Sequence, residues 1–276
     1  MLVRDVVIRV PHGQTHDSDL RAETQLLALL EARAVPFTPR GVRLLNGGDG
    51  KPLAMAYDYV DGRSSKGIRF RGAAREQLAR DLGQFLGALH HVPIDVVAAA
   101  GLPSDDFWYR VYVPLIDSCG RHLPAPVAHE LDSAIRRFQP LIERAPRALV
   151  HADISGTHTL IGADNRLRGI IDFGEVGIAD PAIDFAGILN DHTRSFLERA
   201  LTYYGHAVDP EALQRAEFFI ALVPLFTMRT AAREGDNETL RGAIADLRRR
   251  VRRAVVRVPG GPYHAPGTLG VLDARS

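Results

Sequence analysis

The sequence predicts an α+β protein with a small N-terminal sheet lobe and a larger, mainly helical C-terminal lobe. Short β-branched segments and one helical segment occupy the first sixty residues. Beyond Gly62, long segments carry apolar residues at the spacing of a helix. We therefore expect an N-terminal lobe at residues 1–60 and a C-terminal lobe at 61–258. Residues 259–276 are rich in Pro and Gly and should form a loose tail.

The N-terminal lobe should contain three strands and one helix. The segment 18–34 has an N-cap candidate in Ser18 and apolar residues along one face, which is typical of a helix. "NGGDGK" is turn chemistry and predicts a hairpin; Pro follows Lys51 and no helix begins there, so a phosphate-binding loop is not expected. The strands are expected in "DVVIRV", "GVRLL" and "PLAMAYDYV".

The C-terminal lobe should be built from helices that short strands interrupt. A connector near residues 57–62 precedes it. Leu78, Leu82, Phe85, Leu86 and Leu89 follow helical spacing in the first of these helices. Further helical patterns cover 125–143, 192–205 and 210–255, whereas "ALV", "THTLI" and "RGIID" predict short strands.

Composition excludes several classes of protein. Hydrophobic residues make up 46% and charged residues 24% of the 276, as expected for a globular chain with a sizeable core. The net charge of +1 gives no reason to expect a nucleic acid or a membrane as partner. Arginine supplies 32 of the 34 basic residues, a skew that resembles genomic base composition. A single cysteine, Cys119, cannot form an internal disulfide, and no signal peptide is evident, so we expect a cytoplasmic protein.

The stretch "LVHADISGTHTL" gathers polar, chemistry-bearing residues between two apolar edges. His151, Asp153 and His158 fall within eight residues, and Asp172 follows in "IIDFG". Neighbouring hairpin ends can bring them into one cleft, where carboxylates could hold Mg²⁺ or accept a proton from a hydroxyl. A zinc hydrolase is the alternative, but neither an HxHxD nor an HExxH cluster is present.

"HADISGTH" followed by "NRLRGIIDFGEVGIADPAIDF" resembles the catalytic and metal loops of the aminoglycoside phosphotransferase family, a branch of the protein-kinase-like fold. His158 stands where the family usually has Asn. That exchange resembles the branch that phosphorylates the 2''-hydroxyl of aminoglycosides, and also macrolide kinases. The similarity runs from about Val6 to Val255. It implies a two-lobed kinase-like fold that transfers the γ-phosphate of ATP or GTP to a hydroxyl of a small molecule. An aminoglycoside is the leading acceptor, with a role in antibiotic resistance.

The resemblance also implies roles for the residues of the two loops. Asp153 would orient the acceptor hydroxyl and take its proton, because phosphoryl transfer depends on positioning and charge neutralisation. Asp172 would bind Mg²⁺. His158 would supply a second metal contact or position a metal-bound water. Of the remaining loop residues, His151 and Asp184 would be structural, and Asp180 would face a cationic substrate.

In the N-terminal lobe the resemblance marks a nucleotide site. Arg9 in "VVIRV" stands where the family places a phosphate-anchoring lysine, and Glu23 matches the helix glutamate that pairs with it. Arginine keeps the charge on a longer, planar head, so the exchange is not neutral. Met55 would lie near the gatekeeper position. The base of the nucleotide would hydrogen-bond backbone groups in the segment that contains Ala56, Tyr57, Asp58 and Tyr59.

One departure from the family concerns the start of the chain. The family has two strands and a phosphate-covering loop before the strand that holds Arg9, but only eight residues precede Arg9 here. Either the start codon was assigned late, or the chain is short and lacks a lid over the phosphates. If that edge of the sheet is missing, "DVVIRV" is expected to be an exposed edge strand.

Two rival functions stay open at this point. A kinase of a macrolide or a metabolic alcohol would have a less acidic substrate cleft than an aminoglycoside kinase. A non-catalytic, kinase-like binding protein would explain the short N-terminus, although Asp153 and Asp172 argue for catalysis. The acids that could line a substrate cleft, besides Asp180, are Asp105, Asp106, Asp191, Glu234, Asp236 and Glu238.

Overall fold

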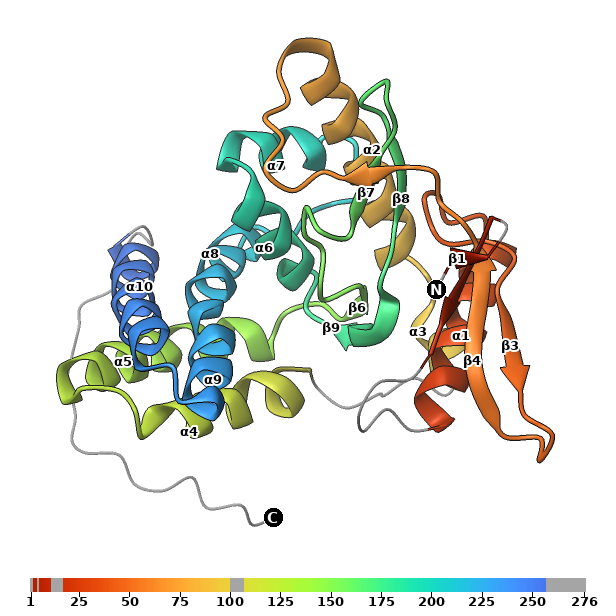
Figure 1. Ribbon diagram of the computed structural model, residues 1–276. Helices are drawn as coiled ribbons and strands as arrows, with labels where there is room; N and C mark the ends of the chain where they lie inside the picture. The colour runs from red at the N-terminus through yellow and green to blue at the C-terminus, as the bar shows by residue number, and fades with distance from the viewer. Residues whose placement is uncertain (1, 4, 11–16, 100–106, 257–276) are drawn as a thin grey trace.

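The computed structural model describes residues 2–3, 5–10, 17–99 and 107–256. Two lobes are visible, a sheet with one helix at the N-terminal end and a larger helical body (Figure 1). The predicted α+β, two-lobed architecture is therefore confirmed. The tail predicted at 259–276 lies outside the described residues.

The N-terminal lobe is a four-stranded antiparallel sheet in the order β1-β2-β4-β3. Helix α1 (Asp17–Ala32) packs against it, with Leu26, Leu27 and Leu30 buried as the periodicity predicted. Because α1 begins at Asp17, Ser18 lies inside its first turn and is not the N-cap. The strands are β1 (Leu2–Val3), β2 (Val6–Arg9), β3 (Arg43–Asn46) and β4 (Pro52–Asp58).

Strand β2 is not the fully exposed edge that we expected. Residues Val6 and Val7 pair with Val3 and Leu2 of β1, through a turn in which Asp5 has a φ of 64°. On its other side β2 pairs with β4, and Arg9 lies opposite Met55. The short β1 thus completes part of the ladder next to the strand that carries Arg9. The hairpin predicted at "NGGDGK" joins β3 to β4, and the Gly47 N–H donates to the Lys51 carbonyl at 2.8 Å.

A short connector leads from the sheet into the second lobe. Strand β5 (Arg63–Ser64) already pairs with β7 (Thr159–Ile161), which pairs with β8 (Leu167–Ile170). A separate two-stranded ladder joins β6 (Ala148–Val150) to β9 (Gly177–Ala179). We therefore propose that the boundary between the lobes lies between β4 and β5, close to the position predicted from the sequence.

Helices make up the rest of the second lobe. The pattern at 210–255 breaks into three helices, because Pro224 begins a new helix and Gly235 ends it in the left-handed conformation with a φ of 72°. The helices are α2 (Gly72–His90), α3 (Ile94–Ala99), the π-helical turn η1 (Trp108–Tyr112), α4 (Val113–Gly120), α5 (Ala125–Glu143), the 3₁₀ turn η2 (Phe173–Glu175), α6 (Ala182–Asp191), α7 (Arg194–Leu201), α8 (Ala212–Leu222), α9 (Pro224–Glu234) and α10 (Asn237–Val256).

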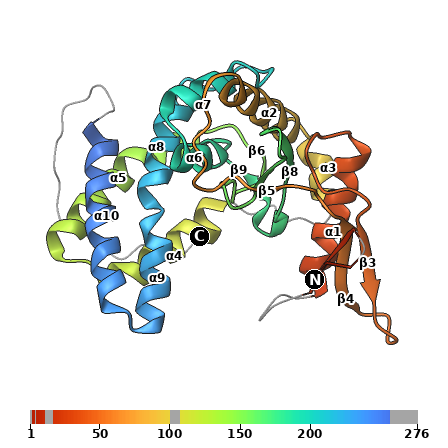
Figure 2. The same cartoon turned by 45° about the horizontal axis from the view of Figure 1, so that its top comes forward.

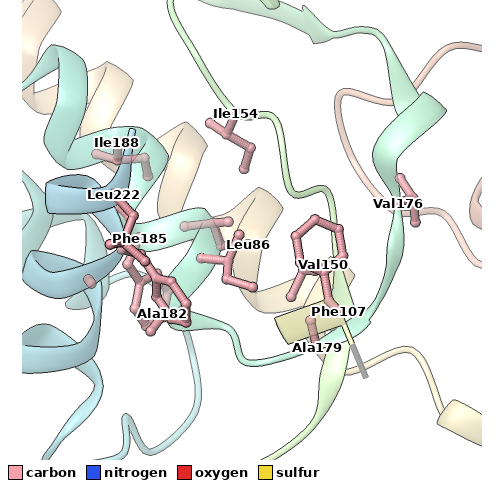
Figure 3. Close-up of a cluster of buried hydrophobic side chains, with 14 of the residues drawn as sticks. Leu86, Phe107, Val150, Ile154, Val176, Ala179, Ala182, Phe185, Ile188 and Leu222 are labelled. Atoms are coloured by element: carbon pink, nitrogen blue, oxygen red, sulfur yellow. The ribbon is translucent and has the colours of Figure 1, made fainter. Parts of the chain in front are cut away.

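These helices lie in two groups around the central hairpins. Helices α5, α8 and α10 lie together on the side away from the N-terminal sheet, as both views show (Figures 1 and 2). Helix α6 lies between this group and the loop that follows β6. Figure 3 shows the core at this junction, where Ile154 of that loop points toward Leu86 and Phe185. The loop that follows β6 therefore packs on apolar side chains of the core.

Two glycines allow helix α2 to approach the chain around α7 closely. A Cβ atom on Gly83 would lie 2.1 Å from the Ala200 carbonyl oxygen, and one on Gly87 would lie 2.0 Å from that of Tyr204. Both distances are shorter than any van der Waals contact, so the packing requires glycine at both positions. Within the described ranges, no helix combines the length and the hydropathy that crossing a membrane would need.

Candidate active site

The loop between β6 and β7 is fixed by one buried carboxylate. Asp184, at the start of α6, accepts hydrogen bonds from the backbone N–H groups of His151 and Ala152, both at 2.8 Å. A third bond, at 3.0 Å, comes from Nε2 of the buried His90. Ala152 has a φ of 66°, a conformation that costs a non-glycine residue about 1–2 kcal/mol. These hydrogen bonds of Asp184 hold a strained backbone in place.

His151 joins this loop to the next one. Its Nε2 lies 3.1 Å from the carbonyl oxygen of Ile171, and a carbonyl can only accept, so Nε2 carries the proton. Nδ1 is then free to accept from the Asp153 N–H at 3.2 Å. Complete burial lowers the pKa of His151, and the ring is neutral. The residue therefore orients Asp153 and the residue before Asp172 together.

Two carboxylates and an imidazole meet at the mouth of these loops. Nδ1 of His158 lies 3.3 Å from Oδ2 of Asp153, and Nε2 lies 3.5 Å from Oδ2 of Asp172. Nδ1 also lies 2.9 Å from the Asp153 carbonyl oxygen, to which it must donate. In a neutral imidazole this bond places the lone pair on Nε2, on the side of Asp172. Burial raises the pKa of Asp153, His158 lowers it, and Asp172 raises it further.

The backbone at Asp172 is also unusual. Asp172 has a φ of 68° and a ψ of 70°, in the left-handed region that L-residues rarely adopt. Such outliers in an otherwise regular fold concentrate at functional sites. The conformation turns the carboxylate out of the hairpin, where the residue is exposed and faces His158.

Arg9 connects the two lobes at this site. One guanidinium nitrogen bonds Glu23 on α1, and the other lies 3.1 Å from Oδ1 of Asp172. Burial raises the pKa of Glu23 to about 7, although the guanidinium opposes that rise. A Cβ atom on Gly174 would lie 2.8 Å from the same guanidinium, so the glycine leaves room for it. The predicted pair of Arg9 and Glu23 is present, and it extends to the loop of Asp172.

The segment expected to hold the nucleotide base lies along β4 and the residue that follows it. Met55 is fully buried and lies opposite Arg9 in the ladder between β2 and β4. Tyr57 faces the same side of β4 two residues later, is only half-buried, and interacts electrostatically with Arg9. Met55 and Tyr57 therefore lie on the side of the sheet that carries Arg9, and the placement of Met55 near the gatekeeper position stays a prediction.

The backbone of this segment is largely committed to the sheet. Ala56 pairs with both β2 and β3. The N–H of Asp58 donates to the Arg40 carbonyl at 2.8 Å, and that of Tyr59 donates to the Asp5 carbonyl at 2.7 Å. Asp58 also packs its carboxylate against Gly41. Among the described residues, the first backbone N–H beyond this ladder belongs to Val60, which the sequence analysis did not single out.

Asp180 does not face a substrate in this structure. It is 1% exposed, and both of its oxygens are engaged by Arg215, at 2.6 and 3.1 Å. Arg215 is itself buried and also contacts Asp209 at 2.5 Å. The prediction that Asp180 binds a cationic substrate conflicts with this burial, and the residue instead ties β9 to α8.

The other acids suggested from the sequence are dispersed. Asp191 accepts a hydrogen bond from the Gly156 N–H and so belongs to the support of the first loop. Glu234 and Asp236 line a separate hollow at the turn between α9 and α10. Glu238 opens α10 beside them. Asp105 and Asp106 lie outside the described residues.

The donor set at the loops is compatible with a divalent cation. One ligand atom each from Asp153, His158 and Asp172 lie within 4.8 Å of one another. Two carboxylates suit Mg²⁺, which needs few protein ligands because it keeps several waters. Imidazole is a softer ligand than a carboxylate oxygen, so Asp172 is a stronger candidate than His158 to bind Mg²⁺.

A four-stranded sheet with an Arg–Glu pair, joined to a helical lobe whose paired loops carry Asp153 and Asp172, defines the protein-kinase-like class of fold. A model of the phosphotransferase enzyme family matches residues 2–219. The chain belongs to that family.

Solved structures share this fold. The GDP complex of aminoglycoside 2'-phosphotransferase-IIIa superposes with a TM-score of 0.76 and 24% identity, covering 90% of this chain and 87% of the other. A macrolide 2'-phosphotransferase type I gives a TM-score of 0.66 and 24% identity, over 88% and 83% of the two chains. Viomycin phosphotransferase from Streptomyces vinaceus is 33% identical over 104 residues, which are 37% of this chain and only 36% of that protein.

Proposed function

We propose that this protein transfers the γ-phosphate of ATP or GTP to a hydroxyl group of a small molecule. The observation that carries the proposal is the meeting of Asp153, His158 and Asp172 within reach of Arg9. Family membership supports it, as do the nucleotides in the names of the similar structures, GDP for one enzyme and ADP for another.

In this proposal Asp153 receives the proton of the acceptor hydroxyl. Its pKa is raised by burial, and a carboxylate of raised pKa is the better proton acceptor. His151 orients the Asp153 backbone, while Asp184 holds the loop on which both residues stand. Phosphoryl transfer depends mainly on such positioning of the reacting groups.

Asp172 and His158 are the proposed ligands of Mg²⁺, which when bound would neutralise charge on the nucleotide phosphates. Arg9 would then exchange its contact with Asp172 for a phosphate oxygen while keeping Glu23 as its support. The base would lie near Tyr57, with the Val60 N–H as the proposed backbone donor. We also propose a cytoplasmic location, because the chain has a single, buried cysteine.

The acceptor is open to several classes. Related structures contain kanamycin or gentamicin, and another relative acts on viomycin. Aminoglycosides are therefore the acceptors that the family suggests first, with antibiotic resistance as the biological role. Macrolides and metabolic alcohols are the same-class alternatives. A non-catalytic binding protein is disfavoured because ligand atoms of both loop carboxylates and of His158 lie within 4.8 Å of one another.

The test is transfer of radiolabelled γ-phosphate from ATP and from GTP to a panel of aminoglycosides, macrolides and simple polyols. Asp153→Asn should lower transfer by at least a hundredfold with the melting temperature unchanged. The matched control is Asp117→Asn on the exposed side of α4, which should leave transfer unaltered. Transfer by Asp153→Asn at the rate of that control would show that the assignment is wrong.

A further inference from the structure

A hollow of about 750 Å³ lies where the end of α6 and the start of α7 meet α8 and α10. It is separate from the groups that we assign to phosphoryl transfer. Its apolar floor is supplied by Leu189, Ile220 and Ala254. The polar residues that line it are Asn190, His192, Thr193, Arg194, Glu217, Asp246, Arg249, Arg250 and Arg253.

The lining of this hollow carries an excess of positive charge. Four guanidinium groups face two carboxylates, and 4 − 2 leaves a surplus of two positive charges. His192 adds none, because burial lowers the pKa of its imidazole. The surplus is local, since the whole chain has a net charge of only +1. A hollow of this kind attracts anions and repels polycations.

The carboxylates in the hollow are already occupied by arginine. Glu217 accepts from Arg194 at 2.8 Å. The two oxygens of Asp246 are shared, one with Arg249 at 2.5 Å and one with Arg250 at 3.0 Å. They therefore have little capacity to receive an amine from a ligand.

Guanidinium donors remain for a ligand. Arg250 donates to the Ile220 carbonyl at 3.2 Å and to Asp246, which fixes its head at the wall of the hollow. A guanidinium has five N–H donors in all. Arg253 lies one turn further along α10 and has no ion-pair partner in the described part of the chain. Together they suit a planar oxyanion such as a carboxylate, or a phosphate.

The hollow adjoins the loop of Asp153. Asn190 lines it, and the next residue, Asp191, bonds the N–H of Gly156. Gly156 follows Asp153 by three residues, and three residues of chain span at most about 10 Å. The end of α6 therefore connects the wall of the hollow to the loop that carries Asp153.

We propose that this hollow binds an anionic group, a carboxylate or a phosphate, on the hydroxylated acceptor. This inference rests on the proposed phosphotransferase function and refines its acceptor class. The substrate is then an acidic hydroxylated molecule, and a polyamine such as kanamycin is a poor ligand of this surface. Arg250 and Arg253 are the residues that determine this specificity.

The probes are citrate, which carries three carboxylates and a hydroxyl, and kanamycin, a polycation. Binding of each is measured by thermal unfolding and calorimetric titration at constant ionic strength. The variants are Arg250→Gln and Arg253→Gln, with Arg136→Gln on the exposed face of α5 as the control. Arg253 is exposed, so Arg253→Gln should fold normally. That variant keeps the test valid if Arg250→Gln is destabilised.

Citrate should bind the wild-type chain and the control equally, and about tenfold more weakly to either variant, because each loses charge-assisted hydrogen bonds. Three results would overturn the inference: no binding of citrate, equal binding by all four proteins, or tighter binding of kanamycin than of citrate. Asp153→Asn should bind citrate normally. Failure of the phosphotransferase assignment is recognised separately, by transfer that does not depend on Asp153.

Discussion

The anchor of the catalytic loop provides the sharpest test of how the fold supports the site. Asp184 is 1% exposed and receives two backbone N–H groups and the ring of His90. Asp184→Asn keeps the size of the side chain but removes its charge and puts an amide NH₂ where one oxygen stood. That NH₂ cannot accept the bond that the loop backbone donates. Breaking a buried, hydrogen-bonded charge interaction by changing one partner costs about 3–5 kcal/mol.

For a chain of this length, a loss of 1 kcal/mol lowers the melting temperature by about 2–4 °C, so the fall for Asp184→Asn should be about 6–20 °C. Thermal unfolding followed by circular dichroism measures it. The control is Asp132→Asn, which removes only an i,i+4 pair with Arg136 on α5 and should cost about 0.5 kcal/mol or less. Melting temperatures within 1–2 °C of one another would refute the reasoning, since a true anchor cannot be lost so cheaply.

Three further predictions follow from other buried contacts. Arg215→Met leaves the carboxylate of Asp180 unpaired inside the protein and should cost about 3–5 kcal/mol in denaturant unfolding; a loss below 1 kcal/mol would mean that this pair is not structural. Gly87→Ala should be strongly destabilising because the new methyl group would meet a carbonyl oxygen. Gly242→Ala, with open space around it on α10, should instead stabilise the protein by up to about 1 kcal/mol. Equal changes in stability for the two variants would contradict the close packing at Gly87. Burial raises the pKa of Glu23 above its unfolded value, to about 7. The native state therefore binds more protons than the unfolded state between about pH 4.5 and 7, and the free energy of unfolding falls as pH rises through that window. Glu23→Gln should flatten this decline, and an unchanged pH profile of stability in the variant would contradict the prediction.

Local patterns in the sequence predicted most of the fold. The spacing of apolar residues predicted α1, α2 and α5, because the residues on one buried face of a helix recur about every 3.6 positions. The turn at 46–51 was readable for a similar reason, since its glycines and Asp49 suit a tight hairpin and no helix follows. The paired loops were found because Asp153, His158 and Asp172 keep a spacing that phosphotransferases share.

At the candidate site, the features that the sequence did not reveal are contacts between residues distant in sequence. Asp180 looked available until the fold brought Arg215 against it, 35 residues later in the chain. The arginines of α10 resembled a compositional bias, and only the position of α10 beside the end of α6 gives them a common hollow. Such pairings depend on tertiary structure, which local periodicity does not encode.

We propose that Asp172 and Arg9 form a nucleotide site that requires Mg²⁺. The most direct measurement is the thermal unfolding of the 276-residue chain with ATP or GTP, with and without Mg²⁺, for the wild type and Asp172→Asn. A nucleotide at about 100 times its dissociation constant should stabilise the wild type by ~2.7 kcal/mol. We expect a rise in melting temperature that requires Mg²⁺ and disappears in Asp172→Asn. The absence of any shift, or a shift of equal size in Asp172→Asn, would contradict it.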